Sequence, residues 1–92
     1  MKQIWHRHAV LAFCLIKSDK VNPAALEATK AVALAPNQSQ AHYYLALAQY
    51  RLGQNAKARD SLQRTMELDK KGFWTSSAVD LLNELPKDIA PS

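Results

Sequence analysis

The sequence repeats itself at a spacing of 34 residues, and this repeat constrains the fold more than any other feature. Five positions are identical between the two copies: His8/His42, Leu11/Leu45, Ala12/Ala46, Ala24/Ala58 and Leu34/Leu68. Four more keep the side-chain type: Phe13/Leu47, Lys17/Arg51, Lys30/Arg64 and Val32/Met66. A unit of this length copied in tandem is typical of antiparallel helical hairpins that stack into an array. We therefore expect an all-α fold whose product is a surface rather than a catalytic centre.

Turn-forming residues divide the chain into five predicted helices. The helices are expected over residues 2–17, 23–34, 39–52, 55–69 and 75–85. Their expected caps are Asn22, with Pro23 at the first helical position, then Asn37 or Ser39, and finally Thr75. Gly53 is expected to end the third helix in the left-handed conformation, and Pro86 to stop the fifth. Because the connections are short, each helix must fold back alongside its predecessor.

The predicted organisation is a single domain over residues 1–86 with a flexible tail at 87–92. The first unit covers about 5–38, the second about 39–72, and a capping helix about 75–85. Ala12 with Ala24, and Ala46 with Ala58, are small where the two helices of a hairpin cross. The larger core residues are expected to be Leu11, Leu45, Leu62 and Leu68. Two units are near the lower limit for a stable array, so the chain is either part of a longer array or self-associates.

The charge pattern does not favour a nucleic-acid partner. The net charge is +4, but the basic residues are scattered, and Asp60 lies four residues from Arg64 on one predicted helix face. Cys14 is the only cysteine, which excludes a disulfide framework or a thiolate metal cluster and favours a reducing compartment. We expect a cytoplasmic protein, with a periplasmic location or a larger exported protein as alternatives.

The apolar run at 9–16 is too short for a membrane span or the core of a signal peptide. The residues before Cys14 look loosely like a lipoprotein cleavage box, but Phe13 is too bulky for the position before such a cysteine. The same residues also fit the repeat register. We therefore expect neither export by this segment nor a membrane partner.

The order and spacing of particular residue types in each unit match the pattern of a known repeat family. The second unit carries Leu45-Ala46, Gly53, Ala58, Leu62 and Glu67-Leu68-Asp69 in order. The first carries Leu11-Ala12, Ala24, Ala31 and Leu34-Ala35-Pro36-Asn37. With these residues the chain resembles the tetratricopeptide repeat family over about 5–71. The resemblance implies a right-handed α-solenoid of helix-turn-helix repeats that acts as a non-catalytic scaffold for protein–protein interaction.

Several positions depart from the family pattern. They are His8 and His42 in place of larger apolar residues, Asp19 in place of a turn glycine, Gln49, Thr65 and Lys70. We expect them to weaken individual contacts and to leave the architecture unchanged. The two histidines have no cysteine or carboxylate beside them, so hydrogen-bonded side chains are favoured over metal ligands.

The resemblance implies that the first helix of each unit lines a concave, partner-binding groove. On a helical wheel of about 100° per residue, the first and third helices each carry one apolar stripe that faces the partner helix of their own hairpin. A second apolar stripe lies about a third of a turn away from it. The candidate groove residues on this stripe are Phe13, Ile16, Lys17, Tyr43, Leu47, Tyr50 and Arg51. The alternative is that these residues pack against each other or against a neighbouring repeat.

The leading functional hypothesis is a protein-interaction module that binds an apolar or amphipathic helical segment in a groove formed by the first, third and fifth helices. Tyr43, Tyr44 and Leu47 stand where family members that clamp a peptide carboxylate use basic and amide residues, so such a clamp is not expected. The second hypothesis is homo-oligomerisation through the same apolar stripe and the N-terminal helix. No motif for catalysis, a cofactor or phosphate binding is present, and we expect a non-enzyme without a cofactor or metal.

Overall fold

The computed structural model describes residues 4–70 and 72–85, which form five α-helices and, within these ranges, no strand. The helices are α1 (Ile4–Lys17), α2 (Val21–Leu34), α3 (Ser39–Arg51), α4 (Asn55–Leu68) and α5 (Phe73–Glu84). This confirms the predicted all-α fold and its helix count. The stop expected at Pro86 and the tail expected at 87–92 lie outside the described residues.

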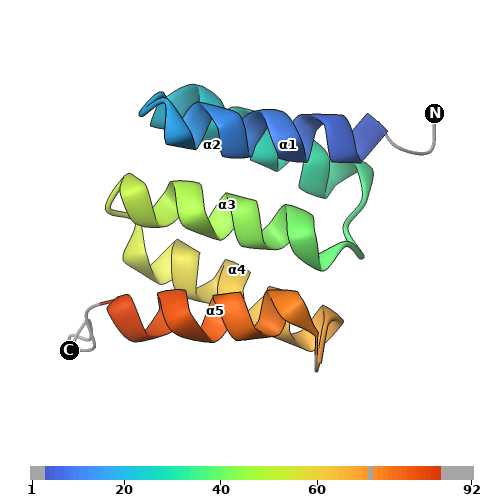
Figure 1. Cartoon of the computed structure of the whole chain (residues 1–92), viewed down its shortest axis with the longest axis vertical. Coiled ribbons are helices and arrows are strands. Elements are labelled where there is room, and N and C mark those ends of the chain that lie inside the picture. The colour runs from blue at the N-terminus through green and yellow to red at the C-terminus, as the bar shows by residue number, and fades with distance from the viewer. Residues whose placement is uncertain (1–3, 71, 86–92) are drawn as a thin grey trace.

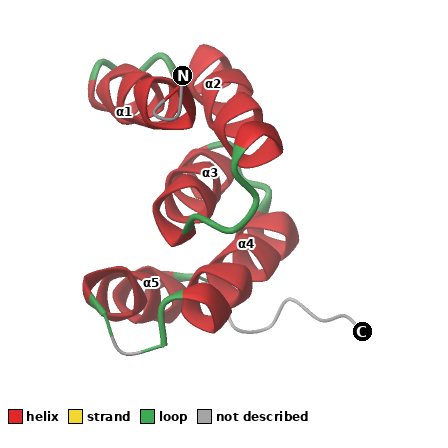
Figure 2. Cartoon of the chain, turned by 90° about the vertical axis from the view of Figure 1, so that its right-hand side faces the viewer, coloured by secondary structure: helices red, strands yellow, loops and turns green. Residues whose placement is uncertain are grey.

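The helices form two layers with a curved outline. α1 and α2 pack as one hairpin and α3 and α4 as another, while α5 packs against α3 and α4. Figure 1 shows α1, α3 and α5 running in the same direction on the near side, with α2 and α4 behind them. In Figure 2 α3 is set back between α1 and α5, so their layer is concave. α1 does not contact α5, which leaves the space in front of α3 open.

Alanine occupies the places where helices meet. Ten alanines have no exposed surface: Ala9, Ala12, Ala24, Ala28, Ala31, Ala41, Ala46, Ala48, Ala58 and Ala78. Side chains at a helix contact set the distance between the helix axes, so alanine allows a close approach. Both predicted crossing pairs belong to this set. Of the larger residues predicted for the core, Leu62 is fully buried, whereas Leu11 is 44% exposed and the prediction for it was wrong.

The predicted caps of α2 and α3 were wrong. The N-cap positions are Lys20 and Gln38, and neither side chain bonds to the helix it precedes. Asn22 and Ser39 instead lie in the first turns of their helices. Asp19 causes the earlier start of α2, since its φ of 65° closes the turn directly after α1. Asp tolerates this left-handed conformation, and Gly53, with a φ of 81°, adopts it as predicted.

The cap of α5 comes from the end of α4. Thr75 was expected to cap this helix, but α5 begins at Phe73 and Thr75 lies inside it. The Asp69 carboxylate accepts hydrogen bonds from the backbone N–H groups of Trp74, at 2.9 Å, and Thr75, at 3.3 Å. The Thr75 hydroxyl donates to the Asp69 carbonyl. A Cβ at Gly72 would overlap the Asp69 carboxylate, so glycine is needed there for this close approach.

Replacing Asp69 with Ala is expected to destabilise the fold by about 1 kcal/mol, the usual cost of losing a helix cap. The variant leaves two part-buried N–H groups at the start of α5 without an acceptor. Urea denaturation followed by circular dichroism measures the change.

Asp60→Ala is the matched control, because Asp60 is exposed on α4. Its predicted partner Arg64 binds Glu67 instead, at 3.0 Å. We expect a change within about 0.5 kcal/mol for this surface substitution. Equal losses in the two variants would show that Asp69 does not hold α5.

Candidate partner-binding groove

A cavity lies between α3 and α5 on the concave layer. Its volume is about 290 Å³, and α4, which lies behind these helices, contributes no residue to its lining. The lining residues are Tyr43, Leu47 and Tyr50 of α3 with Ser77, Asp80, Leu81 and Glu84 of α5. Three of the seven predicted groove residues are therefore brought together at one cavity.

An aromatic cluster joins α1, α3 and α5 beside this cavity. The rings of Phe13 and Tyr44 are stacked with centroids 5.1 Å apart. Trp74 meets Tyr44 edge-on at 5.6 Å and Tyr43 at the same distance with tilted planes. Offset or edge-on aromatic pairs of this kind contribute beyond their buried area. The cluster ties the three helices of the concave layer together at the start of α3 and α5.

The other predicted groove residues have separate surroundings. Ile16 is only 4% exposed and packs with Ala24 and Ala48, so its side chain belongs to the core. The Nζ atom of Lys17 lies 5.2 Å from the centroid of the Phe13 ring, within the range of a cation–π contact. Arg51 donates to the Asp19 carboxylate at 2.9 Å, which links the end of α3 to the turn before α2.

The sequence placed the fifth helix at the groove but identified none of the α5 residues that line it. Ser77, Asp80 and Glu84 recur at intervals of three and four residues, the spacing that places side chains on one face of a helix. Burial raises the pKa of the Tyr43 hydroxyl, with smaller contributions from Tyr44 and from the negative charges of Asp80 and Glu84. The Tyr43 hydroxyl therefore stays protonated at neutral pH and can donate a hydrogen bond.

Comparison with known families assigns the repeat. Residues 39–71 match the sequence model of the family described as tetratricopeptide repeat. This stretch of the chain is similar to a tetratricopeptide repeat. The matched range begins with α3 and includes α4, and the α1–α2 hairpin carries the same residues at the 34-residue spacing. No curated protein is similar enough to the chain to count as a match.

The repeat matched at residues 39–71 supports a protein–protein interaction module in the general sense. None of the helices in the part of the chain that the structure describes is long and apolar enough to cross a membrane.

Gln49 and Thr65, two of the positions that depart from the tetratricopeptide repeat pattern, have hydrogen-bond partners. Ser61 donates to the Gln49 side chain at 2.8 Å, which joins α3 to α4 inside the second hairpin. The Thr65 hydroxyl is fully buried and donates to the carbonyl of Ser61 at 2.9 Å. These two departures thus replace apolar contacts with polar contacts that are satisfied.

Both repeated histidines are hydrogen-bonded, as the sequence predicted. His8 donates through Nδ1 to the Glu27 carboxylate at 2.6 Å, and His42 donates through Nε2 to the carbonyl of Pro36 at 2.9 Å. Within residues 4–70 and 72–85, no three His, Cys, Asp or Glu side chains gather into a group that could hold a metal ion.

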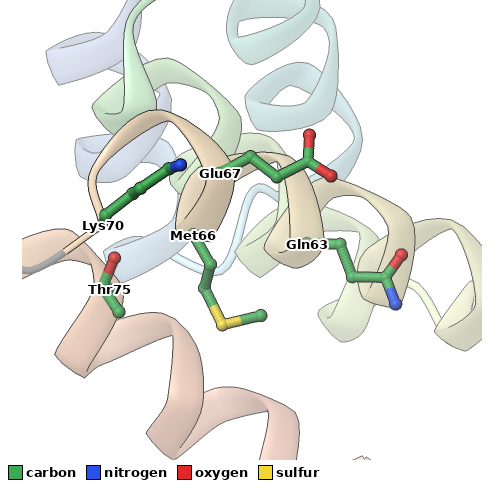
Figure 3. A pocket seen from close by; sticks show the side chains of 5 residues that line it. All are labelled: Gln63, Met66, Glu67, Lys70 and Thr75. Atoms are coloured by element: carbon green, nitrogen blue, oxygen red, sulfur yellow. The ribbon is translucent and has the colours of Figure 1, made fainter.

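A second depression lies between α4 and the start of α5. Its volume is about 570 Å³, and its lining residues are Gln63, Met66, Glu67, Lys70 and Thr75. Figure 3 shows the Met66 side chain directed toward α5, while Glu67 and Lys70 point away from it. The lining has no aromatic side chain and carries both signs of charge, so it favours no particular ligand.

The His8–Glu27 contact predicts a pH-dependent stability. The hydrogen bond from His8 lowers the pKa of Glu27 below its ordinary value of 4.5; burial opposes this shift and Lys30 assists it. A lowered pKa means that the ionised carboxylate stabilises the folded state. This contribution is fully present above about pH 4.5 and is lost as the pH falls through the lowered folded-state value.

Urea midpoints of the wild type and Glu27→Gln, measured from neutral to acidic pH, should therefore converge below about pH 4.5. A constant difference across this range would contradict the role given to Glu27.

Proposed function

We propose that this protein is a non-catalytic scaffold that binds a helical segment of a partner protein along the concave layer of α1, α3 and α5. Residues 1–86 act as one domain for this purpose. The observation that carries the proposal is the cavity between α3 and α5, because it is a concave site lined by aromatic and aliphatic side chains. Tyr residues in such a site are common anchors of binding energy.

The shape of the layer supports a rod-like partner. α1 and α5 stand on either side of α3 without touching each other, so the open space runs along α3. Tyr43, Leu47 and Tyr50 are spaced at three and four residues along this helix, which matches the spacing of anchor residues on an amphipathic helix. Phe13, Lys17 and Arg51 extend the proposed contact surface toward α1, while Ile16 supports it from the core.

Filling the cavity tests the proposal without disturbing the core. Ser77 is half-buried in the cavity lining, and its neighbour Ser76 is exposed and does not line it. Peptides are first selected from a displayed random library by the wild-type protein. Their affinity is then measured for Ser77→Phe and for the matched control Ser76→Phe. We expect a loss of tenfold or more, about 1.4 kcal/mol, for Ser77→Phe alone, because the bulky ring occupies the site of the anchor residue.

Circular dichroism of both variants confirms that the helices are retained. Equal affinities of the wild type and Ser77→Phe would place the binding site elsewhere on the molecule.

Self-association is the second candidate function, and the exposed face of α1 favours it. Val10 occupies in α1 the position that Tyr44 occupies in α3, one repeat later. Tyr44 is 8% exposed because it packs against the preceding hairpin, whereas Val10 is 40% exposed. We expect sedimentation equilibrium to show association that Val10→Lys weakens, since a buried lysine would lose its hydration. A strict monomer at all concentrations would remove this candidate.

A further inference from the structure

The α3–α5 cavity has a charge that differs from the rest of the chain. The chain as a whole carries a net charge of +4, yet the cavity lining includes two carboxylates, Asp80 and Glu84, and no basic residue. The two other depressions described on this surface each include a basic residue, Lys70 in one and Arg59 in the other. The concave site is therefore negative on a positive protein.

These two carboxylates have no cationic partner among the residues that the structure describes. Glu84 only accepts a hydrogen bond from the Tyr50 hydroxyl, at 3.4 Å, and Asp80 forms neither an ion pair nor a hydrogen bond there. By contrast, Asp19, Glu27 and Glu67 each pair with a basic side chain. Asp80 and Glu84 are thus free to meet a cation from another molecule.

Helix stability does not account for the two carboxylates. Asp80 and Glu84 are four residues apart on one face of α5, where like charges repel each other. They also lie in the second half of α5, and Glu84 is its last residue, where the helix dipole disfavours negative charge. Both effects raise the free energy of the isolated protein, and a bound cation would relieve both.

The remaining walls of the cavity suit the stem of a long basic side chain. Tyr43 and Tyr50 present aromatic rings, and Leu47 and Leu81 add aliphatic surface. Lys and Arg side chains bury their methylene stems against such surfaces while the charged group reaches a carboxylate. The cavity has a volume of about 290 Å³, at the lower end of the range of about 300–1,000 Å³ for pockets that enclose a whole small-molecule ligand. A site of this size accommodates a single long side chain.

A divalent metal ion is a poor match for the same residues. Ca²⁺ takes about six to eight oxygen ligands and Mg²⁺ takes about six in a regular octahedron. Two carboxylates on one helix, with apolar walls opposite, supply only part of either set.

We infer that the α3–α5 cavity receives a lysine or arginine side chain of the partner segment, with its stem between Tyr43 and Tyr50 and its charged group at Asp80 and Glu84. This inference rests on the proposed function, since it names the chemistry of the residue that the groove anchors. The partner segment is therefore amphipathic, with a basic residue adjoining its apolar face.

The test uses the peptides selected from the displayed library by the wild-type protein. We expect these peptides to share one Lys or Arg position. Exchanging that residue for glutamine in the peptide, or changing Asp80→Asn together with Glu84→Gln in the protein, should each weaken binding about tenfold, as expected for lost charge-assisted hydrogen bonds. Both changes together should cost little more than either alone, because they remove the same interaction. Asp60→Asn, which removes an exposed carboxylate of α4, is the matched control and should leave the affinity unchanged.

The outcomes separate this inference from the proposed function. Peptides without a shared basic residue, or peptides that bind Asp80→Asn/Glu84→Gln as tightly as the wild type, would overturn the inference. If Ser77→Phe still weakened these peptides, the groove would remain the binding site. If Ser77→Phe bound every selected peptide as tightly as the wild type, both the groove and the basic anchor would be refuted.

Discussion

The close approach of helices at alanine crossings is the constraint on which the rest of this structure depends. Each of the three buried clusters contains fully buried alanines, and small side chains allow helix axes to approach closely. Large side chains must therefore lie beside the crossings rather than within them. The aromatic residues of α1 and α3 pack against these clusters: Phe13 stacks on Tyr44, and Tyr43 contacts Trp74 of α5.

The position of α5 then determines the binding site. Asp69 holds the first turn of this helix through backbone hydrogen bonds, and Trp74 packs against Tyr43 and Tyr44 of α3. These contacts secure the N-terminal half of α5. Further along, the serine and the two carboxylates of α5 face the tyrosines of α3 across an unfilled space.

The architecture could be predicted because residues at equivalent positions of the two repeat units show which side chains α1–α2 and α3–α4 have in common. The crossing alanines, Gly53 and the hydrogen-bonded histidines follow from residue types at fixed positions in each unit. The helix starts did not follow, since they depend on turn conformation: a left-handed Asp19 moves the start of α2, and the carboxylate that caps α5 belongs to the preceding helix.

The site was predicted only in part, for two physical reasons. The helical wheel places Phe13 and Ile16 on one stripe, but only the actual crossing of α1 and α3 shows that Ile16 packs against Ala48 in the core. α5 belongs to neither complete hairpin, so the internal comparison gave no information on the face that it turns toward α3. Asp80 and Glu84 consequently emerged only from the folded arrangement.

The most direct test of the central claim is to map where a selected peptide contacts the protein. In an NMR titration of the ¹⁵N-labelled chain, the account predicts that the largest amide shift changes occur at Tyr43, Leu47, Tyr50, Ser77 and Asp80. The backs of α2 and α4, including Gln63, should change little. Shift changes concentrated on α2 and α4, with the α3–α5 cavity unaffected, would contradict it.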